Sequence, residues 1–204
     1  MRIYYADIRG ADEENSLYPP LSPSRGSAFG TSLLAYAYGD FTGKAILPAI
    51  EKLAFGRPVF TKRPAPHFSI SHCKTHIFCV VSKSPVGIDA EPLDRKVSSL
   101  SITRLTTAKE REALSFLETW TLRESYLKLT GEGDLRTLRF YREEGKIIPP
   151  SPEVFCKLYP DVDGCLAALC SKSKNFPETC TKVPIEKLLK KDKPLHCHPK
   201  DLRL

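Results

Sequence analysis

The chain has 204 residues, of which 27% are charged and 41% hydrophobic, and its formal net charge is +7. This composition is ordinary for a soluble globular protein. The longest apolar runs, 77–81 and 165–170, are too short to span a bilayer, and the first residues contain no apolar signal-peptide segment. We therefore expect a cytoplasmic protein that does not contact a membrane.

The basic charge is concentrated near the end of the chain. Residues 171–204 contain nine Lys or Arg and four Asp or Glu. We interpret the basic stretch as a solvated terminus that can contact an acidic partner, and its lack of interleaved aromatic residues argues against nucleic acid. The chain has seven cysteines and no Cys-x-x-Cys pair, which indicates reduced, buried thiols. The stretch His196-Cys197-His198 is not expected to bind a metal, because its potential ligands are directly adjacent in a polar, proline-flanked tail.

The first half of the chain predicts a mixture of strands and helices. An apolar start predicts a strand at 2–8, and a proline- and serine-rich stretch predicts a loop at 11–26. Helices are expected at 27–38, ended by Gly39, and at 45–53. Strands are expected at 68–71, 76–82 and 86–91, followed by a connection at 92–105 that has few large apolar residues.

The second half repeats the order of helices followed by strands. Thr107 and Glu110 form a capping box that predicts a helix over 107–117, and a second helix over 118–130 ends at Gly131. Strands are expected near 137–142, 154–159 and 165–171, with a turn at 160–164 between the last two and a short packing helix at 184–191. The pattern predicts an α+β protein divided into residues 1–92, residues 93–185 and a basic tail, 186–204.

Two short stretches contain the residues that suit catalysis. Asp89 and Glu91 stand two apart on a predicted strand, so they project to one side, about 6.5 Å apart. Glu124 and Lys128 stand four apart and share one face of a helix. Taken alone, an acidic pair such as Asp89 and Glu91 is most often a solvated strand edge, and Glu124 with Lys128 can be a simple ion pair. Three carboxylates and a lysine on rigid elements, however, suit a hard cation and a phosphate.

These stretches belong to a series of four blocks in order along the chain. The blocks are Phe55-Gly56-Arg57-Pro58, Phe68-Ser69-Ile70-Ser71-His72, Val86-Gly87-Ile88-Asp89-Ala90-Glu91, and residues 120–133, which run from Trp120 through Glu124 and Lys128 to Gly131 and Gly133. Together they resemble the motifs of the 4′-phosphopantetheinyl transferases, specifically the surfactin-type branch.

The chain departs from that family's pattern at several positions. Arg123 stands where lysine is usual, which changes hydrogen-bond geometry while keeping the charge. Cys73 replaces a serine after the Ser-His pair, and Ala90 replaces a larger apolar residue. Of the basic cluster that usually precedes the first helix, only Arg25 remains.

The resemblance implies a fold of two similar α/β halves packed as an intramolecular pseudo-dimer. It also implies an activity, transfer of the 4′-phosphopantetheine arm of coenzyme A to a serine of an apo acyl or peptidyl carrier protein, with release of 3′,5′-adenosine bisphosphate. We expect a monomer, because a pseudo-dimeric chain already contains both halves of the cleft.

The resemblance also assigns roles to individual residues. Asp89, Glu91 and Glu124 would hold Mg²⁺, or alternatively Mn²⁺, and Lys128 would reach the same phosphates. Glu124 is also the best candidate for general base, a role that competes with tight metal binding. The 3′-phosphate of coenzyme A would be contacted by Ser71 and His72, with Arg57 and Arg25 adding positive charge.

Other readings of these residues remain open. His72 taken alone is more often structural, Trp120 is expected to be a core anchor, and Arg123 is expected to form a supporting ion pair with Glu110. The same acids could serve a metal-dependent phosphoester hydrolase, although no further acidic or histidine cluster supplies a second metal or a base. A binding module with a degenerate acidic cluster is the third possibility.

Overall fold

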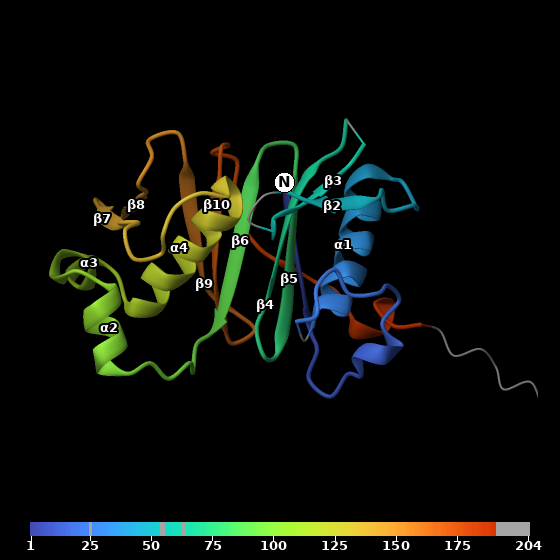
Figure 1. Ribbon diagram of the computed structural model, residues 1–204, viewed down its shortest axis with the longest axis horizontal. Coiled ribbons are helices and arrows are strands. Elements are labelled where there is room, and N and C mark those ends of the chain that lie inside the picture. Colours follow the sequence, from blue (N-terminus) through green and yellow to red (C-terminus); the bar gives the residue numbers. More distant parts are fainter. Residues whose placement is uncertain (25, 54–55, 63, 191–204) are drawn as a thin grey trace, which may run out of the picture.

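The computed structural model describes residues 1–24, 26–53, 56–62 and 64–190, and its fold is α+β (Figure 1). The strands are β1 (Arg2–Asp7), β2 (Ile50–Lys52), β3 (Pro58–Phe60), β4 (His67–His72), β5 (His76–Ser82), β6 (Val86–Pro92), β7 (Tyr141–Glu143), β8 (Lys146–Ile148), β9 (Phe155–Val162), β10 (Cys165–Ser171) and β11 (Thr181–Lys182). The helices are α1 (Ser27–Thr42), α2 (Ser99–Leu105), α3 (Ala108–Ala113) and α4 (Phe116–Thr130), with 3₁₀ turns at Glu13–Asn15 and Ile185–Lys187.

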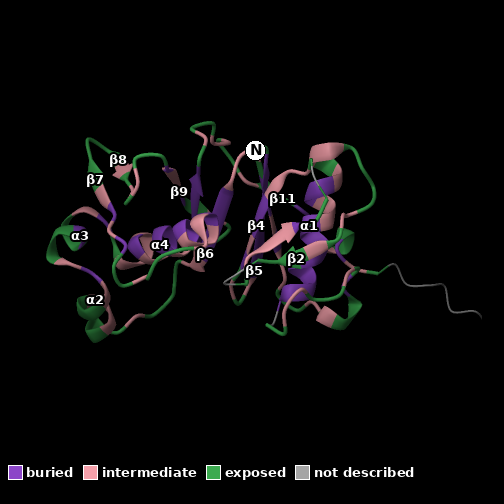
Figure 2. Ribbon diagram, turned by 45° about the horizontal axis from the view of Figure 1, so that its top comes forward, coloured by how far each residue is buried: buried purple, intermediate pink, exposed green. Residues whose placement is uncertain are grey.

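Two sheets form the middle of the molecule. One has the strand order β11-β1-β5-β4 and the other β6-β10-β9, while β2–β3 and β7–β8 are separate hairpins. Helix α1 covers the outer face of the four-stranded sheet, and α4 covers the outer face of the three-stranded sheet. Figure 2 shows buried segments on both helices and on the strands between them. No helix in the described part of the chain has the length and apolar content that a bilayer crossing requires.

Three apolar cores correspond to the three interfaces between these layers. Side chains of β5 alternate between them: Ile77, Cys79 and Val81 face α1, while Phe78 and Val80 face the other sheet. Such alternation is the period-2 pattern of a strand buried on both faces. The third core lies between α4 and the outer face of β10.

Strand β6 has an apolar face and a functional face. Val86, Ile88 and Ala90 are buried in the core between the two sheets. The intervening residues, Gly87 and Asp89, therefore face α4. The packing of β6 thus fixes the direction in which its acidic residues project.

The edges of the two sheets meet where β4 lies beside β6. The backbone N–H of Ile88 donates to the hydroxyl of Ser69 at 3.1 Å, and that of Ala90 donates to the hydroxyl of Ser71 at 3.2 Å. Edge strands present unpaired N–H groups that must find acceptors when they are buried. The two serines of β4 supply those acceptors.

Several sequence predictions need correction in the first half of the chain. The helix expected at 45–53 is wrong: Pro48 lies in that stretch, and residues 50–52 pair with β3 in a hairpin. The first helix does not end at Gly39 but continues to Thr42, and the next residue, Gly43, ends it with a left-handed φ of 72°. The three strands expected at 68–71, 76–82 and 86–91 are confirmed within one residue at each end.

The second half also differs in detail. The connection at 92–105 contains α2. The break between the two predicted helices lies not at 117–118 but at Ser115, which caps α4 and forms a second capping box with Glu118. The Thr107–Glu110 capping box is confirmed. Strand β9 extends to Val162, so the turn before β10 is only Asp163-Gly164, both with positive φ, as two-residue hairpins require. The strand near 137–142 is reduced to β7, which pairs with β8.

The segment 181–190 returns to the first half of the chain. Strand β11 pairs in parallel with β1, and Val183 and Leu188 are buried in the core beneath α1. The short packing helix expected at 184–191 appears as the 3₁₀ turn Ile185–Lys187. The division at residues 92 and 185 remains a prediction, and the packing joins β6 to strands of the second half.

Candidate active site

Helix α4 crosses β6 at very short range because β6 contains Gly87. A Cβ atom at that position would lie 2.1 Å from the carbonyl oxygen of Ser125 and 2.4 Å from the backbone nitrogen of Leu129. Only glycine permits this approach of two backbones. It brings Lys128 to Asp89 and, toward the start of the helix, Trp120 to Glu91.

Asp89 is the hub of the site and is only 6% exposed. Its Oδ1 atom accepts hydrogen bonds from Lys128 Nζ at 2.7 Å and from Ser71 Oγ at 2.8 Å. Its Oδ2 atom is buried and has no hydrogen-bond partner among the described residues. An unpaired buried carboxylate oxygen is costly unless a further group binds it.

Glu91 is held by two side chains that the sequence analysis did not place in the site. Arg95 forms an ion pair with its Oε1 atom, and the indole N–H of Trp120 donates to the same oxygen at 3.2 Å. The Arg95 guanidinium lies 5.4 Å from the centroid of the Trp120 ring. The interpretation of Trp120 as a core anchor is therefore wrong, because this half-buried residue belongs to the acidic site. Its position four residues before Glu124 is the signal that could have identified it.

Glu124 faces the same acids without a fixed partner. It forms no hydrogen bond with the described residues, and Lys128 is paired with Asp89 instead of with Glu124. Burial and then the charge of Asp89 raise the pKa of the Glu124 carboxyl, and the same two causes raise the pKa of Glu91. The site therefore holds more negative charge than its two basic neighbours compensate.

The types of residue in this site suit a divalent cation, but the three carboxylates do not all converge on one point. The unpaired oxygen of Asp89 and the unpaired Glu124 are the oxygen ligands that Mg²⁺ prefers. Among the described residues, the groups whose three ligand atoms lie within 4.8 Å of one another both contain His76, and neither includes Asp89, Glu91 or Glu124. Release of Glu91 from Arg95 would free the third carboxylate.

A pocket of about 480 Å³ opens beside Lys128, a size ordinary for small-molecule sites. The hairpin residues Gly56 and Arg57 form one wall, and the turn after α4, Gly131 to Gly133, forms another. Arg57 Nη1 donates to the carbonyl oxygen of Leu129 at 2.6 Å, so the hairpin is fixed to the last turn of α4. Two cations, Arg57 and Lys128, thus line the cavity together with one acid, Glu132.

The structure separates Ser71 from its neighbour His72. Adjacent residues on a strand point to opposite sides. Ser71 is buried against Asp89 and β6, whereas His72 is exposed and its Nε2 atom lies 3.2 Å from the hydroxyl of Ser24. Arg25, which was predicted to act with them, lies outside the described residues, as do Phe55 and the His196-Cys197-His198 stretch.

The predicted ion pair between Arg123 and Glu110 is confirmed. Both side chains are almost completely buried, with Arg123 Nη2 2.6 Å from Glu110 Oε1. Arg123 also donates to the carbonyl oxygens of Leu105 and Leu135, at 2.5 and 2.8 Å. It therefore joins the end of α2 and the loop after α4 to the helix that carries the site.

Known proteins with similar sequences are 4′-phosphopantetheinyl transferases. No family model matches the chain. The chain is 27% identical over 153 residues to 4′-phosphopantetheinyl transferase Sfp of Bacillus subtilis, a match that covers 66% of this chain and 68% of that protein. It is 37% identical over 76 residues to 4′-phosphopantetheinyl transferase gsp of Aneurinibacillus migulanus, covering 33% of this chain and 32% of that one. Over about two thirds of its length the chain is thus similar to a 4′-phosphopantetheinyl transferase, a protein of the family whose motifs its sequence resembles.

Proposed function

We propose that this protein transfers the 4′-phosphopantetheine arm of coenzyme A to a serine of an apo acyl or peptidyl carrier protein. The observation that carries the proposal is the antiparallel contact of α4 with β6. It brings Asp89, Glu91, Glu124 and Lys128 together, and Lys128 also lines the neighbouring pocket. These residues come from two of the four sequence blocks that the chain shares with the family.

The reaction requires charge neutralisation and positioning more than covalent catalysis. The carrier serine hydroxyl attacks the phosphorus next to the pantetheine arm, the bond from that phosphorus to the bridging oxygen breaks, and 3′,5′-adenosine bisphosphate leaves. The serine proton passes to a base, for which the half-buried Glu124 is the candidate. Lys128 and Arg57 would counter the charge of the pyrophosphate in the pocket.

We propose Mg²⁺ as the metal and Asp89, Glu91 and Glu124 as its ligands, with Mn²⁺ as an alternative. When bound, the ion would supply Lewis-acid stabilisation of the pyrophosphate oxygens. The unpaired Oδ2 of Asp89 and the raised pKa values of the two glutamates support this assignment. Lys128 would stay against Asp89 and orient its carboxylate.

The remaining expectations are also proposals. His72, exposed near Ser24, would contact the 3′-phosphate, while Ser71 would act by orienting Asp89. We further propose that the protein works as a cytoplasmic monomer whose α1 and α4 sides correspond to two pseudo-symmetric halves. The carrier would dock beside the pocket so that its serine reaches Glu124.

The decisive experiment combines the protein with coenzyme A, Mg²⁺ and an apo carrier protein, and measures the mass of the carrier. We expect the carrier to gain one phosphopantetheine group. Asp89→Asn should lower the rate by a factor on the order of 100 or more, because it removes charge from the centre of the site. Asp94→Asn is the matched control, since Asp94 is exposed in the turn after β6.

The same experiment separates the alternatives. Hydrolysis of coenzyme A without any change in carrier mass would favour a phosphoester hydrolase. Carrier binding without either reaction would favour a binding module. Near wild-type transfer by Asp89→Asn would refute the assigned role of Asp89.

A further inference from the structure

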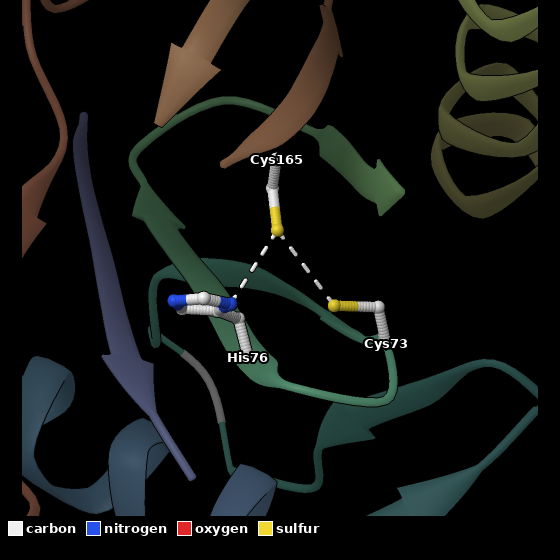
Figure 3. A group of neighbouring side chains, drawn as sticks. All are labelled: Cys73, His76 and Cys165. Carbon is white, nitrogen blue, oxygen red and sulfur yellow. Dashed lines mark hydrogen bonds between the residues drawn. The ribbon is translucent and has the colours of Figure 1, made fainter. Parts of the chain in front are cut away.

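A second cluster of potential ligands lies outside the acidic site. Cys73, His76 and Cys165 point toward one another from two different sheets (Figure 3). Cys73 and His76 form the two ends of the tight turn between β4 and β5, closed by the Cys73 N–H donating to the His76 carbonyl at 2.9 Å. Cys165 is the first residue of β10, paired with Pro92 on β6.

Two of the three distances in this cluster match those between the ligands of a tetrahedral zinc ion. The Sγ atoms of Cys73 and Cys165 are 3.8 Å apart, and Cys165 Sγ is 3.5 Å from His76 Nδ1. With Zn–S bonds of about 2.3 Å and Zn–N bonds of about 2.0–2.1 Å, a tetrahedron has S···S edges of about 3.8 Å and S···N edges of about 3.5–3.6 Å. The third pair, Cys73 Sγ and His76 Nδ1, lies within 4.8 Å.

The other ring nitrogen of His76 is arranged as in known metal sites. The residue is 2% exposed, and Nε2 forms no hydrogen bond with the described residues but lies 3.5 Å from Asp163 Oδ2. A carboxylate facing one ring nitrogen favours the proton there and leaves the other nitrogen unprotonated. That nitrogen, Nδ1, lies 2.9 Å from the Thr75 hydroxyl, and a bound metal ion would replace this hydrogen bond. Asp163 itself is fixed by Lys182 at 2.6 Å.

The charges around His76 indicate which of its two sides would bind the ion. Asp7 and Asp163 also approach His76, but each already has a cationic partner, Arg9 and Lys182 respectively. Neither Cys73 nor Cys165 has a cationic partner at ion-pair distance among the described residues. Two thiolates and a neutral imidazole would balance the charge of a divalent cation, and sulfur ligands select zinc over Mg²⁺.

We propose that Cys73, His76 and Cys165 bind one Zn²⁺ ion, with the fourth position open to water, and that the ion fastens the β4–β5 turn to the start of β10. Such an ion would hold the two sheets together at the end of the molecule opposite the Gly87 contact. Asp163 would orient His76. The proposal is independent of the transferase activity, because it concerns different residues and a different metal.

The test is a metal titration of the full chain after reduction and removal of metals. We expect one zinc ion per chain in competition with a chromophoric chelator. Cobalt alone should give a thiolate-to-metal charge-transfer band and the intense visible bands of tetrahedral Co²⁺. Cys73→Ser should lower the intensity of the charge-transfer band, because one of the two thiolate ligands is lost. It should weaken zinc binding more than Asp163→Asn does. Asp163→Asn should weaken zinc binding by about 10- to 100-fold, and asparagine tolerates the positive φ of this position.

The matched control is Cys156→Ser. Cys156 lies 3.1 Å from Cys170, and neither belongs to a group of three potential metal ligands among the described residues, so this change should leave the zinc affinity and the cobalt spectrum unchanged. A zinc affinity that is unchanged in each of the two single variants, Cys73→Ser and Asp163→Asn, would overturn the proposal. So would a cobalt complex without thiolate bands, or a Cys73–Cys165 disulfide whose reduction yields no zinc site. If Cys73→Ser does not fold, the Asp163→Asn titration and the wild-type cobalt spectrum still decide.

Discussion

At the scale of single residues, the acidic site is defined by unequal pairing of its carboxylates. Asp89 shares one oxygen between Lys128 and Ser71 and leaves the other unpaired. Glu91 is paired with Arg95, whereas Glu124 has no fixed partner among the described side chains. The site is therefore prepared for a cation at Asp89 and Glu124, and binding a third carboxylate requires Glu91 to exchange partners.

This imbalance predicts how stability depends on pH. Burial and the charge of Asp89 raise the pKa of Glu124, so the folded chain holds a proton there more readily than the unfolded chain. Ionised Glu124 therefore lowers the free energy of unfolding at neutral pH. This loss of stability disappears as the pH falls from above the raised pKa of the folded state to the ordinary glutamate pKa of about 4. We expect Glu124→Gln to be more stable than the wild type at pH 7 and nearly equal near pH 4.

Urea unfolding at both pH values measures this difference. Glu112→Gln is the control, because Glu112 is exposed on α3 and should change stability by less than about 0.5 kcal/mol at either pH. A Glu124→Gln protein that is less stable than the wild type at pH 7 would show that Glu124 is paired in solution, against the arrangement described above.

At the scale of the elements, the close packing of α4 on β6 depends on Gly87. We expect Gly87→Ala to destabilise the protein by about 3 kcal/mol or more, because its Cβ would meet backbone atoms that cannot rotate away. Any folded variant should also lose transfer activity, since α4 carries Glu124 and Lys128. The control is Gly39→Ala inside α1, where the nearest atom to the new Cβ is 3.5 Å away. That change should be neutral or stabilise the protein by about 0.5–1 kcal/mol.

Arg123 provides the second constraint on α4. Removing it leaves Glu110 charged and buried, so we expect Arg123→Met to cost about 3–5 kcal/mol in chemical denaturation. The double variant Arg123→Met with Glu110→Gln should recover part of that loss, because no isolated charge remains. If the two changes were simply additive, the pair would not be coupled and the buried ion pair would not be the cause.

The sequence predicted those features of α4 and β6 that depend on local pattern. Alternation placed Asp89 and Glu91 on one face of a strand, and the spacing of four placed Glu124 and Lys128 on one face of a helix. The Arg95 and Trp120 contacts to Glu91 were missed, as was the use of Ser69 and Ser71 as acceptors for β6, because these depend on which strand edges meet. The approach of Cys165 to Cys73 joins residues 92 positions apart and has no local signal.

At the scale of the whole molecule, segment 181–190 ties the end of the described chain to its beginning. Val183 donates from its N–H to the Tyr5 carbonyl at 2.8 Å, and Leu17 donates to the Leu188 carbonyl at 2.9 Å. Leu188 is completely buried in the core beneath α1. The second half of the sequence thereby completes the packing of the first, so the two sheets are expected to unfold together.

The side chain of Leu188 tests that expectation. We expect Leu188→Ala to cost about 2–5 kcal/mol, since it opens a cavity beside α1 that the surrounding side chains fill only in part. Glu186→Ala, at an exposed position of the same segment, should change stability by less than about 0.5 kcal/mol. Denaturation followed both by far-ultraviolet circular dichroism and by Trp120 fluorescence should give coincident transitions for the wild type and for Leu188→Ala. Trp120 reports on the α4 side, far along the chain from the altered core. An unchanged fluorescence midpoint combined with a lowered dichroism midpoint would show that the two sides unfold separately and that segment 181–190 stabilises only one of them.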